Sequence, residues 1–333
     1  MILHPGILAL LAGSVIVFAL TAYGGWLGIR IMSRWDRSSS SEAQLSLERK
    51  TYLVSTLLGY SFGFETLSVF LYVFTVDDIH PLFVGAMCAT GSLNANPIGW
   101  SALGLKIVLF FGCGVWLAVN RLDQRTEDYP LVRLKYSSLL AVVPLAGLDL
   151  YLQLAYFMGL RPEIITSCCG SLFSDGESGV AAELAGLPAR PMMWLFYLSA
   201  GLLAATTVSC LVRRDGWARY LHAAASAAFF GVAIAAVVSF ISLYIYETPT
   251  HHCPFDILQA QFHYIGYPLF ACLFGGTLFG LLPGVFQPLK RAAGLAEEIG
   301  RAERAWLLAG AALHLAFVCL ASWPVLFGDL ILF

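Results

Sequence analysis

Residues 7–30 read ILALLAGSVIVFALTAYGGWLGIR, and Arg34 and Arg37 follow shortly after them. An apolar run of this length is what an α-helix needs to cross roughly 30 Å of hydrocarbon. Lys and Arg beside a membrane span are retained on the cytoplasmic side. The residues before the run lack the positive charge of a cleaved signal peptide. This segment therefore predicts a retained membrane helix whose N-terminus lies outside the cytoplasm.

The same pattern recurs along the chain, with basic stretches on alternate sides of successive apolar runs. We expect helices over 7–30, 52–75, 101–121, 137–160, 192–212, 220–245, 267–288 and 306–328. Sixteen of the nineteen Lys and Arg residues fall in four alternate loops: Arg30, Arg34, Arg37, Arg49, Lys50, Arg121, Arg125, Arg133, Lys135, Arg213, Arg214, Arg219, Lys290, Arg291, Arg301 and Arg304. The sequence thus predicts an all-α class: a polytopic membrane helix bundle with eight transmembrane helices, N-out and C-out.

The composition agrees with a membrane location. Hydrophobic residues make up 59% of the chain and charged residues 12%, and the mean hydropathy is +0.76, outside the range of soluble domains. No polar stretch is long enough to bury its own core, so residues 1–333 are expected to form one integral domain surrounded by membrane lipid. The short loops suggest a bacterial inner (plasma) membrane, and residues 292–304 suggest an amphipathic helix on its inner surface. No basic field indicates nucleic acid as a partner.

Cysteine and histidine gather in the loops that this topology places outside the cytoplasm. The residues concerned are Cys88, Cys168, Cys169, His251, His252 and Cys253. Thiolate and imidazole together suit soft or borderline metals such as copper(I) and zinc, and Asp256 adds a carboxylate close to Cys253. No single loop has zinc-finger spacing, so several loops would have to supply the ligands. The favoured interpretation is an extracytoplasmic site that binds, transports or transfers a metal to a partner.

A second interpretation is redox catalysis. Cys253-Pro254-Phe255-Asp256 differs by one residue from a C-P-x-C motif, in which one thiolate attacks and the second cysteine resolves. Cys253 would then be the attacking catalytic thiol, with Cys168 and Cys169 as a relay or Cys88 as the resolving partner. In this arrangement the chain resembles the quinone-linked disulfide-forming membrane enzymes, although it lacks their local CxxC and has twice their helices. The resemblance implies a quinone as electron acceptor.

A third interpretation is structural. Four cysteines on an oxidising side of a membrane are the number needed for two loop disulfides, with three alternative connectivities. The chain would then be a non-catalytic subunit of a transport or redox complex. The sequence contains no GxxxxGK[ST] motif, so ATP hydrolysis by a P-loop would need a separate ATPase subunit as a partner. A permease or a periplasmic carrier is an alternative partner. The residues do not establish whether the protein is an enzyme.

Three charged residues fall inside the apolar runs. Glu65 and Asp149 lie near the middle of theirs, and Lys106 lies a short way in from the outer side. Charges in hydrocarbon are costly and face the bundle interior in pairs or neutral form. We expect Lys106 to pair with Glu65, and Asp149 to serve as a proton or cation station, with His314 as its candidate partner. In the metal interpretation Glu65 and Asp149 are both intramembrane charge stations. The alternative for the Lys106–Glu65 pair is a purely structural role.

Two further expectations concern single helices. Gly276, Gly280 and Gly284 recur every four residues, which predicts a face where another helix packs closely. His222 is expected at the inner membrane interface in contact with water. His222 and His314 are only roughly level, so they do not indicate a haem site.

Overall fold

The computed structural model of the chain describes residues 2–35, 41–126, 129–163, 165–166, 187–213, 215–291 and 295–332. Within these ranges the regular secondary structure is helical, joined by turns and loops, and one isolated β-bridge links Val84 and Ile165. Eight helical segments there are long and apolar enough to cross a membrane: Pro5–Arg34, Glu42–Leu82, Ile98–Asp123, Val132–Gly159, Ala189–Val212, Gly216–Tyr246, Gly266–Arg291 and Leu295–Phe327. Each predicted run coincides with one of them, so the all-α class and the eight helices are confirmed. The N-out, C-out topology stays a prediction.

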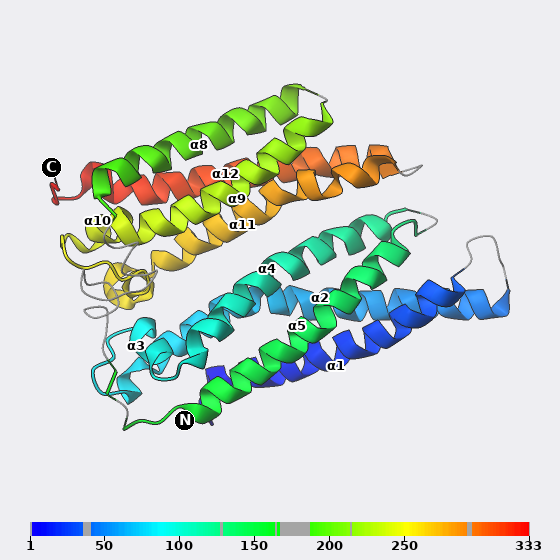
Figure 1. The fold of residues 1–333 in the computed structure, drawn as a ribbon, viewed down its shortest axis with the longest axis horizontal. Helices are drawn as coiled ribbons and strands as arrows, with labels where there is room; N and C mark the ends of the chain where they lie inside the picture. The colour runs from blue at the N-terminus through cyan, green and yellow to red at the C-terminus, as the bar shows by residue number, and fades with distance from the viewer. Residues whose placement is uncertain are drawn as a thin grey trace. The chain divides into compact units, whose positions relative to one another are not determined.

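The chain divides into two compact units. In its described part, unit 1 (Met1–Ile79 and Ser92–Ile164) is built on four long helices: α1 (Pro5–Arg34), α2 (Glu42–Asp78), α4 (Ile98–Asp123) and α5 (Val132–Gly159). Helices α1 and α4 each pack against both α2 and α5 (Figure 1). Successive helices are therefore neighbours, and the fourth returns to the first, as in an up-and-down four-helix bundle.

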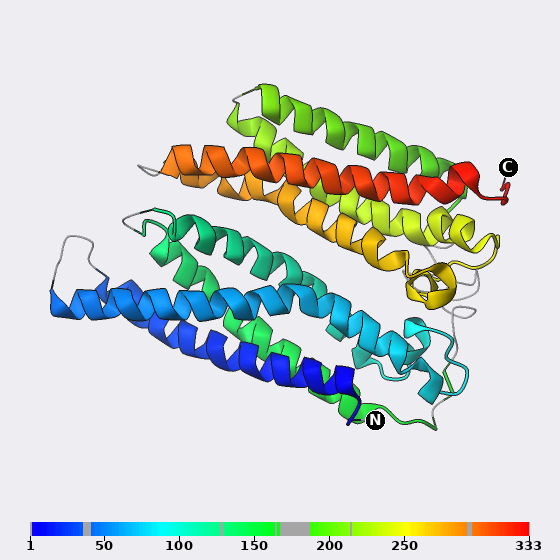
Figure 2. The ribbon, with the colours of Figure 1, turned by 180° about the vertical axis from the view of Figure 1, so that it is seen from behind.

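Unit 2 comprises His80–Gly91 and Ile165–Phe333. Its long described helices are α8 (Ala189–Val212), α9 (Gly216–Ala236), α11 (Gly266–Phe286) and α12 (Leu295–Phe327). Helices α9 and α12 each pack against both α8 and α11 (Figure 2). The order of neighbours is the same as in unit 1, although the sequence shows no convincing internal repeat. The sequence predicts one integral membrane domain over residues 1–333, and this division into two compact units does not test that prediction.

Short elements connect or extend the long helices. They are the 3-10 turns His80–Leu82, Asp256–Leu258, Ala260–Phe262 and Gln287–Arg291, the helices α3 (Ala89–Asn94) and α10 (Ser242–Tyr246), and the π-helical segment Val237–Ile241. The predicted amphipathic helix over 292–304 is helical in its described part, but residues 295–304 are the first turns of α12 and not a separate short helix; its place on a membrane surface stays a prediction. That segment continues into an apolar run, and an uninterrupted helix keeps all its backbone groups paired.

The glycine face of α11 packs as the spacing predicts. A β-carbon at Gly284 would lie 2.5 Å from the Cβ of Ala223 on α9, and one at Gly276 would lie 3.0 Å from the ring of His314 on α12. At Gly280 the added carbon would lie 2.2 Å from Ser226 Oγ and 2.8 Å from its Cβ. The glycines therefore allow α11 to approach both neighbours closely.

Gly280→Ala tests this packing. The new methyl group must displace Ser226 and move α9 away from α11, and overpacking of this kind costs about 1–3 kcal/mol. We expect a lower midpoint of thermal unfolding for the purified protein in detergent. Gly231→Ala on α9 is the matched control, because no atom lies within 4 Å of its added carbon. Equal midpoints for the two variants would contradict the packing account.

Candidate metal centre

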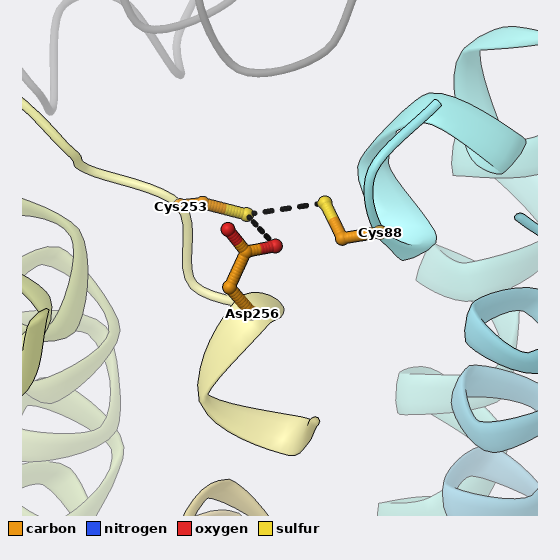
Figure 3. A group of neighbouring side chains, drawn as sticks. All are labelled: Cys88, Cys253 and Asp256. Carbon is orange, nitrogen blue, oxygen red and sulfur yellow. Dashed lines mark hydrogen bonds between the residues drawn. The ribbon is translucent and has the colours of Figure 1, made fainter. Parts of the chain in front are cut away.

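Two cysteines and one carboxylate of unit 2 meet beyond the end of the bundle where α11 begins (Figure 3). Cys88 Sγ lies 3.4 Å from Cys253 Sγ, and Cys253 Sγ lies 3.5 Å from Asp256 Oδ1. The three ligand atoms all lie within 4.8 Å of one another. Both cysteines are 0% exposed and Asp256 is 7% exposed. The cluster therefore holds three potential metal ligands away from water.

Tyr246 holds the turn that carries Cys253. Helix α10 ends at Tyr246, where Glu247 takes up a left-handed conformation with a φ of 54° and reverses the chain. The Tyr246 hydroxyl donates to the Cys253 carbonyl at 2.5 Å and accepts from the Ile257 amide at 3.0 Å. Within the turn, the Phe255 amide donates to Cys253 Sγ at 3.4 Å. One phenol thus fixes both ends of the segment that presents Cys253 and Asp256.

The Cys88 segment is joined to this turn by side chains. Gln259 Nε2 donates to the Met87 carbonyl at 2.7 Å. Thr90 Oγ1 lies 3.5 Å from Cys253 Sγ, so the residue two positions after Cys88 also reaches the second cysteine. Cys88 itself precedes α3, and its carbonyl accepts from the Gly91 amide at 3.0 Å. These contacts bring together two segments that are far apart in the sequence.

The two histidines take different places around the cluster. His251 Nε2 donates to Asp256 Oδ2 at 2.5 Å, and its side chain is 36% exposed. His252 Nδ1 donates to the Val238 carbonyl at 2.9 Å. In the π-helical segment the Ser242 amide bonds Val237 rather than Val238, and the Val238 carbonyl also accepts from the Ser242 hydroxyl at 3.4 Å. His251 therefore contacts the cluster through Asp256. His252 is held by the hydrogen bond of its Nδ1, so in the neutral ring Nε2 carries the lone pair.

The sequence-predicted ligands are thus brought together only in part. The structure pairs Cys88 with Cys253 and places His251 next to them, while Cys168 and Cys169 lie outside the described residues. Asp256 has a more direct role than the sequence suggested, because its carboxylate lies beside the thiol. Tyr246 and Thr90 were not predicted at all. Tyrosine at a helix end and threonine near a cysteine are common, so neither carries a signal in the sequence.

The buried charges of unit 1 form a second cluster. Lys106 Nζ donates to Glu65 Oε1 at 2.8 Å, so the predicted pair is present. Lys106 also donates to Asp149 Oδ2 at 2.9 Å. The lysine stem thus reaches both carboxylates at once, and Lys106 is a partner of Asp149 that the sequence did not assign. The candidate pairing of Asp149 with His314, a residue of unit 2, stays a prediction.

Two other expectations need correction. His222 is not solvated: it is 3% exposed, and its Nδ1 lies 3.1 Å from Thr206 Oγ1. Lys135, counted among the cytoplasmic loop charges, is 1% exposed and donates to Asp123 Oδ2 at 2.6 Å. Both residues lie near helix ends, where their neighbours cover them.

Comparison with protein-family models, curated proteins and solved structures finds no match to this chain.

Tyr246→Phe tests how the turn is held. The substitution leaves the Ile257 amide and the Cys253 carbonyl without their partner, and an unsatisfied buried polar group costs about 1–3 kcal/mol. We expect Cys253 to react faster with a maleimide, because opening of the turn exposes its sulfur. Site-resolved peptide mass spectrometry measures the rate. Tyr197→Phe is the control, since its hydroxyl pairs with Ser322 at an exposed position. An unchanged rate at Cys253 in Tyr246→Phe would contradict the role of the phenol.

Proposed function

We propose that this membrane protein binds a soft transition metal, copper(I) or zinc, through Cys88, Cys253 and Asp256. The observation that carries the proposal is the convergence of two thiols and a carboxylate from two distant segments within 4.8 Å. Thiolate ligands select copper(I) and zinc over the hard cations magnesium and calcium.

The spacing of the cluster fits such an ion. A tetrahedral centre with metal–sulfur bonds of about 2.3 Å has its sulfur atoms about 3.8 Å apart, and sulfur and oxygen ligands are about 3.6 Å apart. The corresponding separations here are 3.4 Å and 3.5 Å. The third separation, from Cys88 Sγ to the Asp256 carboxylate, is within 4.8 Å, so adjustments of up to about 1 Å bring the three ligands to this geometry. Three protein ligands leave a fourth position for water or for an incoming ligand, as in sites that react or exchange.

Electrostatics also favours a cation. A buried carboxylate is costly in a medium of low dielectric constant unless a positive charge shares the site, and a bound cation would also offset the charge of the two thiols when they ionise to bind it. His251, hydrogen-bonded to the far oxygen of Asp256, orients that carboxylate in the way that outer partners orient metal ligands. A purely structural disulfide needs neither Asp256 nor His251.

We place the site on the extracytoplasmic side of a bacterial inner membrane, following the distribution of Lys and Arg. The metal would have one coordination position that no protein ligand fills. A site of this kind fits a protein that transports the metal or transfers it to a partner, such as a permease, an ATPase or a periplasmic carrier. Cys168 and Cys169 belong to the same predicted ligand set and stay candidates for the exchange step.

Metal binding by the purified, reduced protein tests the proposal. We expect one copper(I) or zinc ion per chain, measured by competition with a chromophoric chelator. Cys88→Ser and Cys253→Ser should each lower the affinity at least 100-fold, since each removes a thiolate ligand. Asp256→Asn should lower it less than the cysteine variants do, because the amide oxygen can still coordinate the ion but carries no negative charge.

Cys319→Ser is the matched control for these variants. Cys319 is an exposed cysteine on α12 of the same unit, so its loss should leave the affinity unchanged. Equal losses in all cysteine variants, or no stoichiometric binding to the wild type, would contradict the metal site. Intact mass with and without reductant identifies the structural alternative, in which Cys88 and Cys253 are permanently oxidised.

One observation favours a second candidate, the thiol–disulfide oxidoreductase. Sulfur atoms 3.4 Å apart can join after a small rotation. Formation of the Cys88–Cys253 bond would release two protons and two electrons; a quinone that takes up both electrons and both protons, one of them passed on by Asp256, becomes a quinol. Cys88 is then the geometric partner of Cys253. This candidate predicts quinone-dependent oxidation of the pair, and Cys88→Ser with undiminished turnover would exclude it.

A further inference from the structure

Every long helix of unit 1 contributes to the polar cluster around Lys106. Its members are Ser14 of α1, Glu65 and Ser68 of α2, Lys106 of α4, and Asp149 and Gln153 of α5. The glutamate, the lysine and the aspartate are 1%, 0% and 2% exposed, respectively. The cluster therefore lies in the interior of the bundle, shielded from water.

The cluster has one negative charge too many. One ammonium group faces two carboxylates, so full ionisation leaves a net charge of −1 without solvent. The other buried lysine of unit 1 shows the balanced arrangement: Lys135 pairs with Asp123 alone. Asp123 Oδ1 there accepts from the Leu131 amide at 2.9 Å, so both carboxylate oxygens have donors.

The unpartnered atoms of the cluster indicate what is missing. Among the described residues, Glu65 Oε2, Asp149 Oδ1 and Gln153 Oε1 are buried without a hydrogen-bond partner. All three are acceptors. Such atoms are costly inside a bundle, and three acceptors beside a surplus negative charge call for a positively charged donor.

We propose that the Lys106 cluster is a binding site for one exchangeable proton, carried by Glu65. The proton comes from bulk water and adds to Glu65 Oε2, which converts the carboxylate to a carboxylic acid; no electron is transferred. The product is one Lys106–Asp149 ion pair beside one neutral acid. Buried carboxyl groups in a membrane are stable in this paired or protonated form.

The hydrogen bonds favour Glu65 over Asp149 as the carrier. Asp149 Oδ2 accepts from Lys106 at 2.9 Å and from Gln153 Nε2 at 2.5 Å, with Ser14 Oγ at 3.5 Å. These donors stabilise its ionised form. Glu65 Oε1 accepts from Lys106. Ser68 Oγ lies closer to the Glu65 backbone oxygen, at 2.7 Å, than to Glu65 Oε1, at 3.2 Å, and its one hydroxyl proton is shared between them.

The surroundings add no competing charge. Tyr72 of α2 and Cys113 of α4 interact electrostatically with the carboxylates, and Tyr156 of α5 interacts with Tyr72. Helix α1 faces the cluster with Ser14. Phenols and thiols are ordinarily uncharged at neutral pH, so the count of one cation and two carboxylates decides the protonation of the cluster. The inference goes beyond the metal site and does not depend on it, because it concerns unit 1 alone.

Infrared difference spectroscopy of the purified protein at neutral pH, exchanged between H₂O and D₂O, tests the proposal. A protonated carboxyl has its own carbonyl band, which shifts on deuteration. We expect one such band in the wild type and none in Glu65→Gln or Asp149→Asn, because each leaves one carboxylate to balance Lys106. Lys106→Met leaves two carboxyls without a cation, and the band should become about twice as intense.

Three further variants protect the test from misfolding and from misassignment of the band. Glu65→Asp keeps the acid but should change its band frequency, which identifies the carrier. Asp123→Asn removes a carboxylate from the balanced pair and should leave the band unchanged, as should Asp78→Asn at an exposed helix end. Absence of the band in folded wild-type protein, or its loss on addition of Na⁺ at constant pH, would overturn the proton site. A band that does not shift in D₂O would show that the proton does not exchange and would overturn the proposal equally.

Discussion

Polar groups in the interior of a membrane helix bundle have no water to bind, so each depends on a partner within the protein. Lys106 shows the consequence most clearly. Its ammonium group reaches Glu65 and Ser68 on one helix and Asp149 on another, which ties α2, α4 and α5 together at one level. Lys135 and Asp123 do the same for α4 and α5 at another level. Truncating one member of such a pair leaves an uncompensated charge, which makes these contacts strong determinants of helix register.

The same constraint shapes unit 2. Glu303 of α12 accepts from Arg219 of α9 at 2.8 Å and also from Lys290, which follows α11. Three elements are thus joined through one carboxylate. In the cysteine cluster the requirement is met differently, because the carboxylate of Asp256 lies beside sulfur atoms and has His251 as its hydrogen-bond donor. The two thiols and the carboxylate of the cysteine cluster are suited to bind a cation. In the other buried clusters a lysine or arginine side chain already supplies the positive charge.

The sequence predicts what depends on local pattern. Apolar run length determines the eight helices, and the four-residue glycine spacing determines the close-packed face of α11. Depth along the helix was enough to pair Lys106 with Glu65. Depth alone could not assign Asp149, because its partner depends on how α5 is rotated relative to α4. Lys135 was misplaced for a similar reason: its distance from the span end resembles that of a loop residue, and only packing against Asp123 shows that it is buried.

The candidate site was harder to predict than the fold. The sequence supplied the ligand types and the loops, yet the convergence of Cys88 with Cys253 depends on contacts between segments 165 residues apart. Thr90 and Gln259 make those contacts, Tyr246 holds the turn, and none of the three belongs to a recognisable motif. The role of His252 depends on its bond to a carbonyl of the π-helical segment Val237–Ile241, and no residue pattern indicates that segment.

The most direct test of the metal centre is X-ray absorption spectroscopy of the protein loaded with one equivalent of copper(I) or zinc. The account predicts an inner shell with two sulfur atoms at about 2.3 Å and at least one oxygen or nitrogen atom, and the sulfur signal should fall by half in Cys88→Ser. An inner shell of oxygen and nitrogen alone in the wild type would contradict it.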